Sequence, residues 1–486
     1  MLLNGGSVSF IQLQEKGHLF PNLRRRFNSV GAPGLTMDSE AQPDPIRRPK
    51  IVIQGWYGNG NLGDEIILEC ILSELRGHLP GASFVVISDN PVDTKLRHGV
   101  KSIARSGGIT PRLRRLLTLA SADLFILGGG ELLKRFGSSD LSILTWLGPL
   151  ELAHEMGVPT MTYAVGVSDM LSPRAEAVMK EILSKTDEVL VRDQQSLEVL
   201  KRVGVLKARL TADPALLFPE LHPSYRGQAS PDELKVSLFV NQWFVTRNVV
   251  PDSESWERFK KRVAECVDSL IETQRATVRF IPMQVANIEE DDRAVAHGIA
   301  ELARNRDLIE IRDSEVSPEE LLRLISESNL IIGMRLHSLI LAGALGVPAL
   351  AIEYQSKVTR FSYSIGASDW TVGVTDSSSD LMQNLCTKAA SGEYPLAQVR
   401  ERIPVLQDLA RENARVAAAL ISQRRKGSNR VSRLARGLGE VARRALGRKE
   451  RKKEPQSVTK ATVAEPNTRE ETAPGQSAGN NRVDEQ

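Results

Sequence analysis

Short apolar runs alternate with amphipathic stretches along most of the chain. Lys50–Gly55 and Thr160–Val165 are apolar runs of the kind found in strands that are buried on both faces. From about Glu65 to Arg76, apolar residues instead recur every three or four positions, which is typical of an amphipathic helix. Strands that alternate with helices in this way predict parallel sheets covered by helices.

The alternation is interrupted at His222–Asp232, where Pro223 and Gly227 indicate a linker. The strands predicted before the linker are 50–55, 83–88, 123–127, 160–165, 188–191 and 208–211, and those predicted after it are 235–240, 278–282, 308–311, 330–332 and 348–352. We therefore predict an α/β fold with two Rossmann-like, doubly wound parallel-sheet domains, 50–222 and 233–425. The two domains are expected to face each other across a cleft in a glycosyltransferase B-like arrangement.

The ends of the chain lack this pattern. Residues 1–49 show no sustained period, and residues 454–486 are polar and contain no aromatic side chain, so we predict that both are disordered. A helix at about 405–422 is expected to end the folded part. The following segment, 424–453, carries thirteen Lys or Arg and two Glu, a net charge of +11 that leaves about −8 on the rest of a chain whose total is +3.

Residues 426–453 have the layout of an interfacial helix. The apolar residues on one helical face are Val431, Leu434, Leu438, Val441 and Ala445, and the arginines fall mostly on the other sides. Three glycines lower the helix propensity, so we expect this segment to fold only on contact with an anionic membrane, through 424–453. A solvated basic tail or a nucleic-acid contact is the alternative, although no nucleic acid is expected as a partner.

The composition is that of a soluble globular protein, with 41% hydrophobic and 25% charged residues among 486. No apolar run is long enough to span a bilayer, and the N-terminus lacks a secretory layout. We therefore expect a cytoplasmic protein that is peripheral on the inner face of the cell membrane. Cys70, Cys266 and Cys386 lie far apart, which predicts buried reduced thiols, and no metal site is expected.

Two polar residues open a predicted helix in the second domain. Arg335 and His337 follow the apolar run at 330–332, and Lys357 follows the next predicted strand. The carboxyl ends of parallel strands meet at one edge of the sheet, where α/β folds usually bind ligands, and the first amides of a helix favour an anion. We therefore predict an anion site, in which His337 titrates near neutral pH. The alternative is that Arg335 pairs with an internal carboxylate and His337 is a hydrogen-bonded core residue.

A glycine loop follows the first predicted strand. Gly58, Gly60 and Gly63 match the dinucleotide fingerprint, but Asp64 and Glu65 come next, where a pyrophosphate would sit and be repelled. We expect the glycines to let the backbone approach a neutral ligand. Asn61 and Asp64 would then accept hydrogen bonds from sugar hydroxyls, unless Asp64 only caps the helix.

Further polar or glycine positions follow two other strands of the first domain. Gly128–Gly130 forms a second loop that permits close approach to a ligand. Arg192 ends the strand 188–191 and can point into the cleft, or else form a surface pair with Asp193.

These pieces, taken in order, resemble a known family. M-R-L-H-S-L-I-L-A at 334–342, followed by G-V-P and Y-Q-S-K, is similar to the signature of the polysaccharide pyruvyl transferases. Other matching pieces are G-N-L-G-D-E at 60–65, G-G-G at 128–130, V-R-D at 191–193, A-D-P at 212–214 and P-M-Q at 282–284. The resemblance covers roughly residues 50 to 420. One departure is Asn241-Gln242-Trp243, where an Arg-Pro pair is expected, which puts one cleft contact and the acceptor in doubt.

The resemblance implies an enzyme of exopolysaccharide and cell-envelope synthesis. It would transfer pyruvyl from phosphoenolpyruvate to a sugar of a cell-surface polysaccharide or its lipid-linked precursor, form a ketal and release phosphate. Phosphoenolpyruvate would be a co-substrate, with no further cofactor and no metal. The site residues implied are His337, Arg335 and Arg192 for catalysis, with Leu336, Lys357, Asn61, Asp64, Gly129 and Gly130 for substrate binding. The alternatives are a nucleotide-sugar-dependent glycosyltransferase of the same architecture and a non-catalytic scaffold.

Overall fold

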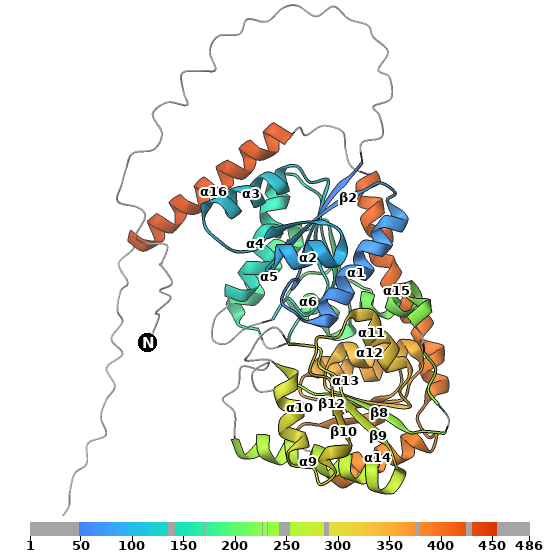
Figure 1. Cartoon of the computed structure of the whole chain (residues 1–486). Coiled ribbons are helices and arrows are strands. Elements are labelled where there is room, and N and C mark those ends of the chain that lie inside the picture. The colour runs from blue at the N-terminus through green and yellow to red at the C-terminus, as the bar shows by residue number, and fades with distance from the viewer. Residues whose placement is uncertain are drawn as a thin grey trace, which may run out of the picture. The chain divides into compact units, whose positions relative to one another are not determined.

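The first of two sheets holds seven strands, all parallel, in the order β3-β2-β1-β4-β5-β6-β7 (Figure 1). The strands are β1 (Lys50–Gln54), β2 (Ser83–Ser88), β3 (Lys101–Ala104), β4 (Leu124–Gly128), β5 (Thr160–Val165), β6 (Glu188–Val191) and β7 (Arg209–Leu210). The helices between them are α1 (Leu62–His78), α2 (Pro91–His98), α3 (Ile109–Ala120), α4 (Leu141–Glu155), α5 (Pro173–Lys185) and α6 (Gln194–Arg202). We call this sheet and its helices the first lobe.

The second sheet repeats the topology with six parallel strands in the order β10-β9-β8-β11-β12-β13. They are β8 (Lys235–Phe239), β9 (Thr277–Phe280), β10 (Ile309–Ile311), β11 (Leu330–Gly333), β12 (Ala349–Glu353) and β13 (Thr371–Gly373). The accompanying helices are α9 (Ser253–Gln274), α10 (Asp292–Ala300), α11 (Pro318–Ser326), α12 (Leu336–Leu345), α13 (Ser356–Ser364) and α14 (Ser379–Ala390). We call this sheet and its helices the second lobe.

This is the computed structural model of the chain, and it describes residues 48–134, 141–169, 171–225, 227–230, 232–242, 253–285, 291–375, 379–423 and 430–453. All of them belong to one compact unit that begins at Arg48. The predictions of disorder at the two ends, except for Arg48 and Pro49, lie outside the described residues, as do Trp243 and residues 424–429.

Both sheets reverse their strand order in the middle, between β1 and β4 and between β8 and β11. In doubly wound sheets, such a reversal opens a crevice at the carboxyl ends of the strands. The predicted α/β fold with two doubly wound parallel sheets is therefore confirmed. The pattern missed β3 and β13. Both are short strands at a sheet edge, where partial exposure removes the continuous apolar run that marks a central strand.

Helix α15 (Leu396–Ser422) connects the lobes. It starts earlier than predicted and continues through Pro404, then packs against α1 and α12. Asn413, fully buried on this helix, accepts a hydrogen bond from the Thr211 hydroxyl of the first lobe at 3.1 Å. A polar bond of this kind fixes where the helix rests on the first lobe.

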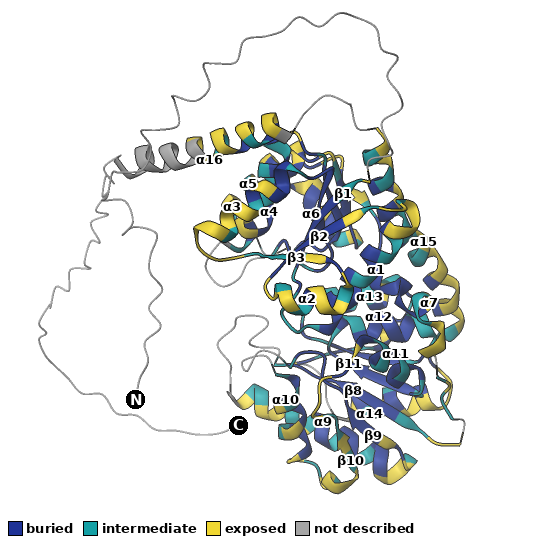
Figure 2. Ribbon diagram, turned by 45° about the horizontal axis from the view of Figure 1, so that its top comes forward, coloured by how far each residue is buried: buried dark blue, intermediate teal, exposed yellow. Residues whose placement is uncertain are grey.

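Helix α16 (Arg430–Lys453) lies along α3 and α4 of the first lobe. Arg433 is buried, and its Nη1 donates to the carbonyl of Ala122 at 2.6 Å. The expectation that this segment folds only on a membrane, after a folded part that ends near residue 422, is therefore wrong. A buried arginine and a protein partner already support the helix. Figure 2 shows that much of its remaining surface is exposed. Among the described helices, none is both long and apolar enough to cross a bilayer.

Candidate functional site

The carboxyl ends of strands from both lobes surround a cavity of about 120 Å³. Its lining residues are Trp56, Asn61, Asp64, Gly130, Glu131, Leu132, Lys134, Trp146, Arg192, Met283, Arg335, Leu336, His337, Tyr354 and Lys357. All the site residues named from the sequence are in this lining except Gly129. The cavity lies where both sheets reverse their strand order, which is the usual ligand position in such folds.

His337 enters the cavity in the first turn of α12 and packs directly against the start of α1. A side-chain carbon built on Gly63 would come within 1.9 Å of the imidazole Nδ1, so this position has room only for glycine. The third glycine of the loop therefore provides space for a histidine from the other lobe. In the dinucleotide fingerprint, the third glycine would be needed for nucleotide binding. Here Gly63 is needed because the His337 ring fills the space beside it.

The other ring nitrogen of His337 is buried without a hydrogen-bond partner among the described residues. The Oδ2 atom of Asp213 lies 3.9 Å from Nε2, beyond hydrogen-bond distance. Burial lowers the pKa of His337 to about 4. Asp213 opposes this shift, whereas Arg192, Lys357 and Arg335 add to it. The imidazole is therefore neutral near pH 7, which differs from the expected titration near neutrality.

We expect Gly63→Ala to lower kcat at least about tenfold, because the added methyl group pushes the His337 ring out of its place. Phosphate release under saturating substrate measures the effect. Gly77→Ala, on the same helix with open space around it, serves as the matched control and should keep wild-type activity. Wild-type kcat in a folded Gly63→Ala protein would show that the ring position is unimportant.

Arg335 is fixed by a carboxylate from the second lobe. Its Nε donates to Asp292 at 3.1 Å, and its Nη2 bonds the other oxygen of the same carboxylate. Asp292 is buried and also accepts from the backbone amides of Met283 and Gln284. The alternative left open from the sequence, an internal carboxylate partner, is thus present. The guanidinium nevertheless lines the cavity, held in one orientation by that partner.

Arg192 is fixed in the same manner by the first lobe. It is 9% exposed, and its Nη1 donates to Asp213 at 2.9 Å. Asp193 lies farther from it, with 3.6 Å between the nearest oxygen and Nε. Because Arg192 is buried and faces the cavity, the alternative of a surface pair with Asp193 does not describe it.

Two lysines share one buried carboxylate. Lys357 and Lys134 each place Nζ 3.8 Å from Oε2 of Glu131. Burial alone would raise the pKa of Glu131, but the two lysines outweigh it and the pKa is below its ordinary value. Lys357 also lies 5.2 Å from the ring centre of Tyr354. The sequence reading missed Lys134, Glu131 and Tyr354, although Glu131 directly follows the second glycine loop.

Asp64 lines the cavity from the first turn of α1 and is not the residue that caps this helix. The N-cap of α1 is Asn61, whose side chain accepts from the amide of Gly63 at 3.0 Å. The Asp64 carboxylate is 9% exposed and has no hydrogen bond or ion pair to the described residues. Burial raises its pKa to about 7, and the neighbouring charge of Glu65 contributes, while Lys134, Lys357 and Arg192 partly oppose the shift. Asp64 is therefore a buried carboxyl group that titrates near neutral pH.

The glycine loops position this carboxyl group and exclude a dinucleotide. Gly130 has a φ of +81°, and a side chain there would approach Asp64 to 2.9 Å. Gly129 has a φ of +62° and abuts Ile67, so it shapes the turn without lining the cavity. In the first loop, Glu65 accepts from the amide of Gly58 at 2.8 Å. The Glu65 carboxylate therefore already accepts the hydrogen bond of a loop amide that a pyrophosphate would need.

Two tryptophans, also missed, form an aromatic wall on the first lobe. The ring centres of Trp56 and Trp146 lie 5.7 Å apart, and both line the cavity. The Arg105 guanidinium carbon lies 4.9 Å from the first ring centre and 4.5 Å from the second. An aromatic face beside a carboxylate suits a sugar, which has both C–H and O–H groups.

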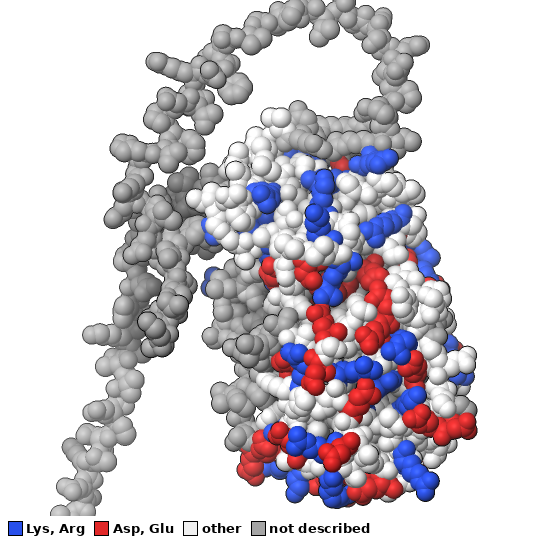
Figure 3. All heavy atoms as spheres, in the orientation of Figure 1, with Lys and Arg blue, Asp and Glu red and all other residues white. Residues whose placement is uncertain are grey.

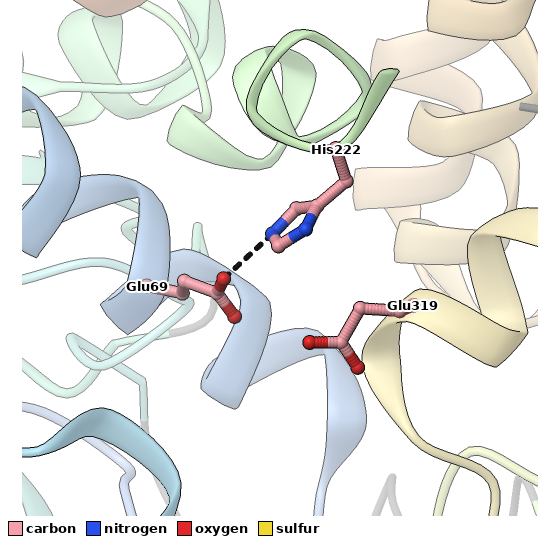
Figure 4. Close-up of side chains that lie close together, drawn as sticks. All are labelled: Glu69, His222 and Glu319. Atoms are coloured by element: carbon pink, nitrogen blue, oxygen red, sulfur yellow. Dashed lines mark hydrogen bonds and ion pairs between the residues drawn. The ribbon is translucent and has the colours of Figure 1, made fainter. Parts of the chain in front are cut away.

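A second cluster of titratable groups lies between α1, the end of α7 (Phe218–Leu221) and α11 (Figure 4). His222 Nε2 is 2.6 Å from Glu69 Oε1, with Glu319 on the other side of the ring. Within the described chain, these three side chains could hold a metal ion, because their ligand atoms lie within 4.8 Å of one another. The histidine and Glu69 already satisfy each other, and the cluster joins the lobes away from the cavity.

Comparisons with known proteins give a family match and a curated relative. A family model described as "Polysaccharide pyruvyl transferase" matches residues 61–356. The amylovoran biosynthesis protein AmsJ of Erwinia amylovora is 22% identical over 357 residues, which are 63% of this chain and 84% of AmsJ.

Among solved structures, a putative UDP-N-acetylglucosamine 2-epimerase from Listeria monocytogenes superposes with a TM-score of 0.54 at 12% identity, over 77% of this chain and 96% of that one. The S. aureus MnaA–UDP structure gives a TM-score of 0.52 at 13% identity, over 78% and 99%. At such identities the likeness shows a shared fold alone, the two-lobed architecture of glycosyltransferase B-like proteins.

Proposed function

Because this chain belongs to the polysaccharide pyruvyl transferase family, we propose that it transfers the pyruvyl group of phosphoenolpyruvate to two hydroxyls of a sugar in polysaccharide biosynthesis. The methylene carbon of phosphoenolpyruvate takes a proton and becomes a methyl group. The two sugar oxygens bond to the neighbouring carbon and phosphate leaves. The two hydroxyls lose two protons in total. The methylene carbon gains one proton and the departing phosphate gains the other, so the reaction balances.

The observation that best supports this proposal is the ring of four cations around so small a cavity, namely Arg192, Arg335, Lys357 and Lys134. Phosphoenolpyruvate carries a phosphate and a carboxylate on three carbons, and each charge-assisted hydrogen bond contributes about 1.5–3 kcal/mol. The carboxylate behind each cation keeps it in place before the substrate arrives. Preorganisation of this kind lowers the ordering cost of binding.

The acceptor sugar would bind on the side of the first lobe. Trp56 and Trp146 offer an aromatic face, and the Asp64 carboxyl group lies in the same cavity with unused hydrogen-bonding capacity. We propose that Asp64 takes the proton of the attacking hydroxyl and that His337 donates a proton to the methylene carbon. The family description names a polysaccharide, and AmsJ is named for the biosynthesis of amylovoran, which supports an acceptor in a cell-surface polysaccharide or its lipid-linked precursor. A contact of residues 424–453 with an anionic inner membrane face, also proposed, would bring the enzyme to such a precursor.

Phosphate release from phosphoenolpyruvate, measured with and without cell-envelope oligosaccharide acceptors, tests the reaction. Acceptor-dependent phosphate release and a product heavier by a pyruvyl ketal are expected. We also propose that no metal or other cofactor takes part, since the four cations can neutralise the donor, so EDTA should leave the rate unchanged. Release of a nucleotide from a sugar nucleotide, with no phosphate from phosphoenolpyruvate, would instead establish a glycosyltransferase.

Arg335→Lys should raise the KM for phosphoenolpyruvate about tenfold and change kcat less. Lysine keeps the charge, but a single ammonium cannot span Asp292 and a substrate anion as the planar guanidinium does. Initial rates against phosphoenolpyruvate concentration measure the change. Arg293→Lys is the matched control, because Arg293 pairs with the partly exposed Asp291 outside the cavity. An unchanged KM in Arg335→Lys would remove Arg335 from the donor site.

A further inference from the structure

Helices α3 and α16 lie side by side on the first lobe and run antiparallel (Figures 1 and 2). Arg433 bonds the carbonyl of Ala122, just beyond the end of α3. One turn later, a side chain at Gly437 would meet Leu116, inside α3, at 3.2 Å. The contacts thus move back along α3 as they advance along α16, which defines the antiparallel pairing.

Each of these helices exposes a row of large aliphatic side chains. The row on α3 is Ile109, Leu113 and Leu117, and the row on α16 is Val431, Leu438 and Val441. All six are between 47% and 78% exposed. Aliphatic side chains spaced by about one or two turns form a continuous strip along a helix, which scattered surface residues do not.

The two strips face the same side of the helix pair. An α-helix turns by about 100° per residue, so Leu113 and Leu117 lie roughly 60° and 100° around α3 from the contact residue Leu116. Leu438 and Val441 lie roughly 100° and 40° around α16 from its contact residue Gly437, in the same rotational sense. In an antiparallel pair, equal senses of rotation place both strips on one side. The result is a single apolar face built from both helices.

Basic side chains border this face. Arg112 and Arg114 lie about 100° to either side of Leu113, and α3 contains no acidic residue. Arg436 and Arg443 are exposed on α16. They lie about 100° and 120° around this helix from Gly437, in the opposite sense to Leu438 and Val441, so on α16 they point away from this face. Figure 3 shows several separate Lys and Arg and few Asp or Glu over the upper part of the first lobe, whereas both signs of charge mix over the rest of the face in view. Aliphatic side chains flanked by arginines are the features that bind an anionic bilayer, with the arginines at the lipid phosphates.

We propose that the paired helices α3 and α16 together dock the enzyme on an anionic lipid bilayer. A second copy of the chain would bring two basic faces together, which like-charge repulsion opposes. Leucine and valine side chains offer neither the stacking nor the hydrogen bonds that a nucleic acid needs. The docking face lies on the lobe that holds Asp64 and Trp56. If the proposed function holds, it therefore brings the acceptor side towards lipid-linked sugars.

Sedimentation of the full-length enzyme with vesicles tests the proposal. Phosphatidylcholine vesicles with phosphatidylglycerol should bind the enzyme at low salt, and phosphatidylcholine alone should bind it far more weakly. The double variant Leu113→Ser with Leu117→Ser should reduce binding to anionic vesicles by about tenfold or more, although 424–486 is intact. Arg112→Gln with Arg114→Gln should reduce it as well, because these two arginines flank Leu113 on α3. Leu308→Ser, at a residue 62% exposed on the second lobe, is the matched control and should bind like the wild type.

Thermal unfolding and phosphate release without vesicles show that each variant is folded, and they separate this proposal from the proposed reaction. If the α3 double variant binds anionic vesicles as the wild type does, the proposal is wrong and residues 424–486 bind them without α3. Absence of binding to anionic vesicles would also overturn it. So would a dimer in light scattering that the same double variant dissociates, because a second copy would then cover the face.

Discussion

Replacing His337 by alanine should lower kcat by about 10²–10⁴-fold while the protein stays folded. The imidazole reaches the cavity with one nitrogen unpartnered, and it is neutral because burial and three cations lower its pKa. The phosphate and carboxylate of bound phosphoenolpyruvate would offset those cations. We therefore expect the pKa to rise when the donor binds, so that His337 can carry a proton to the methylene carbon only in the complex.

Phosphate release by purified His337→Ala protein, with the melting temperature as a check on folding, measures this effect. His297→Ala is the matched control, because His297 is an exposed histidine of the second lobe that pairs with Asp313 away from the cavity. A folded His337→Ala protein with wild-type kcat would remove the residue from the mechanism. Equal losses in His337→Ala and Gly63→Ala would show that the position of the ring matters as much as its presence.

The repeating strands and helices could be predicted from the sequence because the central strands are buried on both faces and read as apolar runs. The edge strands β3 and β13 could not, since partial exposure gives them mixed composition. The basic helix was misjudged for a related reason. Its apolar strip and its three glycines suggested an interfacial helix that folds only on a membrane. The face that packs on the lobe instead contains Arg433 and Gly437, which a hydrophobic pattern scores as polar or small.

The candidate site was predictable where a residue follows a strand or opens a helix, as with Arg192, Arg335 and His337. The carboxylates that fix the two arginines were not predicted, because Asp213 and Asp292 are distant in sequence from their partners. Asp213 lies within the A-D-P motif at 212–214, so the sequence marked this residue but did not indicate that it binds Arg192. The pKa values were beyond sequence reasoning. They depend on burial, which made His337 less basic and Asp64 less acidic than their ordinary values.

Asp64→Asn should lower kcat about 10²-fold or more and remove the dependence of kcat/KM on pH near neutrality. The carboxyl group titrates at about pH 7, and only its ionised form accepts a proton. The wild-type kcat/KM for the acceptor should therefore rise as the pH increases through about 7, or somewhat above it because bound phosphoenolpyruvate would offset Lys134, Lys357 and Arg192, which lower this pKa. The variant should show no such rise. The KM for phosphoenolpyruvate should change little if Asp64 acts on the acceptor, as proposed above.

Stability gives this variant a second, independent readout. Because its pKa is raised in the folded state, Asp64 must be buried either protonated or ionised, and burying it ionised lowers the free energy of unfolding. This loss of stability grows from the ordinary pKa near 4 up to about pH 7. Asparagine has no such cost, so Asp64→Asn should raise the melting temperature, and by more at pH 8 than at pH 5. Asp93→Asn, at a surface residue of α2 paired with Arg97, is the matched control and should leave the rate unchanged. If Asp64→Asn weakens phosphoenolpyruvate binding with acceptor kinetics intact, Asp64 belongs to the donor side instead. A persistent rise of kcat/KM through pH 7 would assign the base to another group.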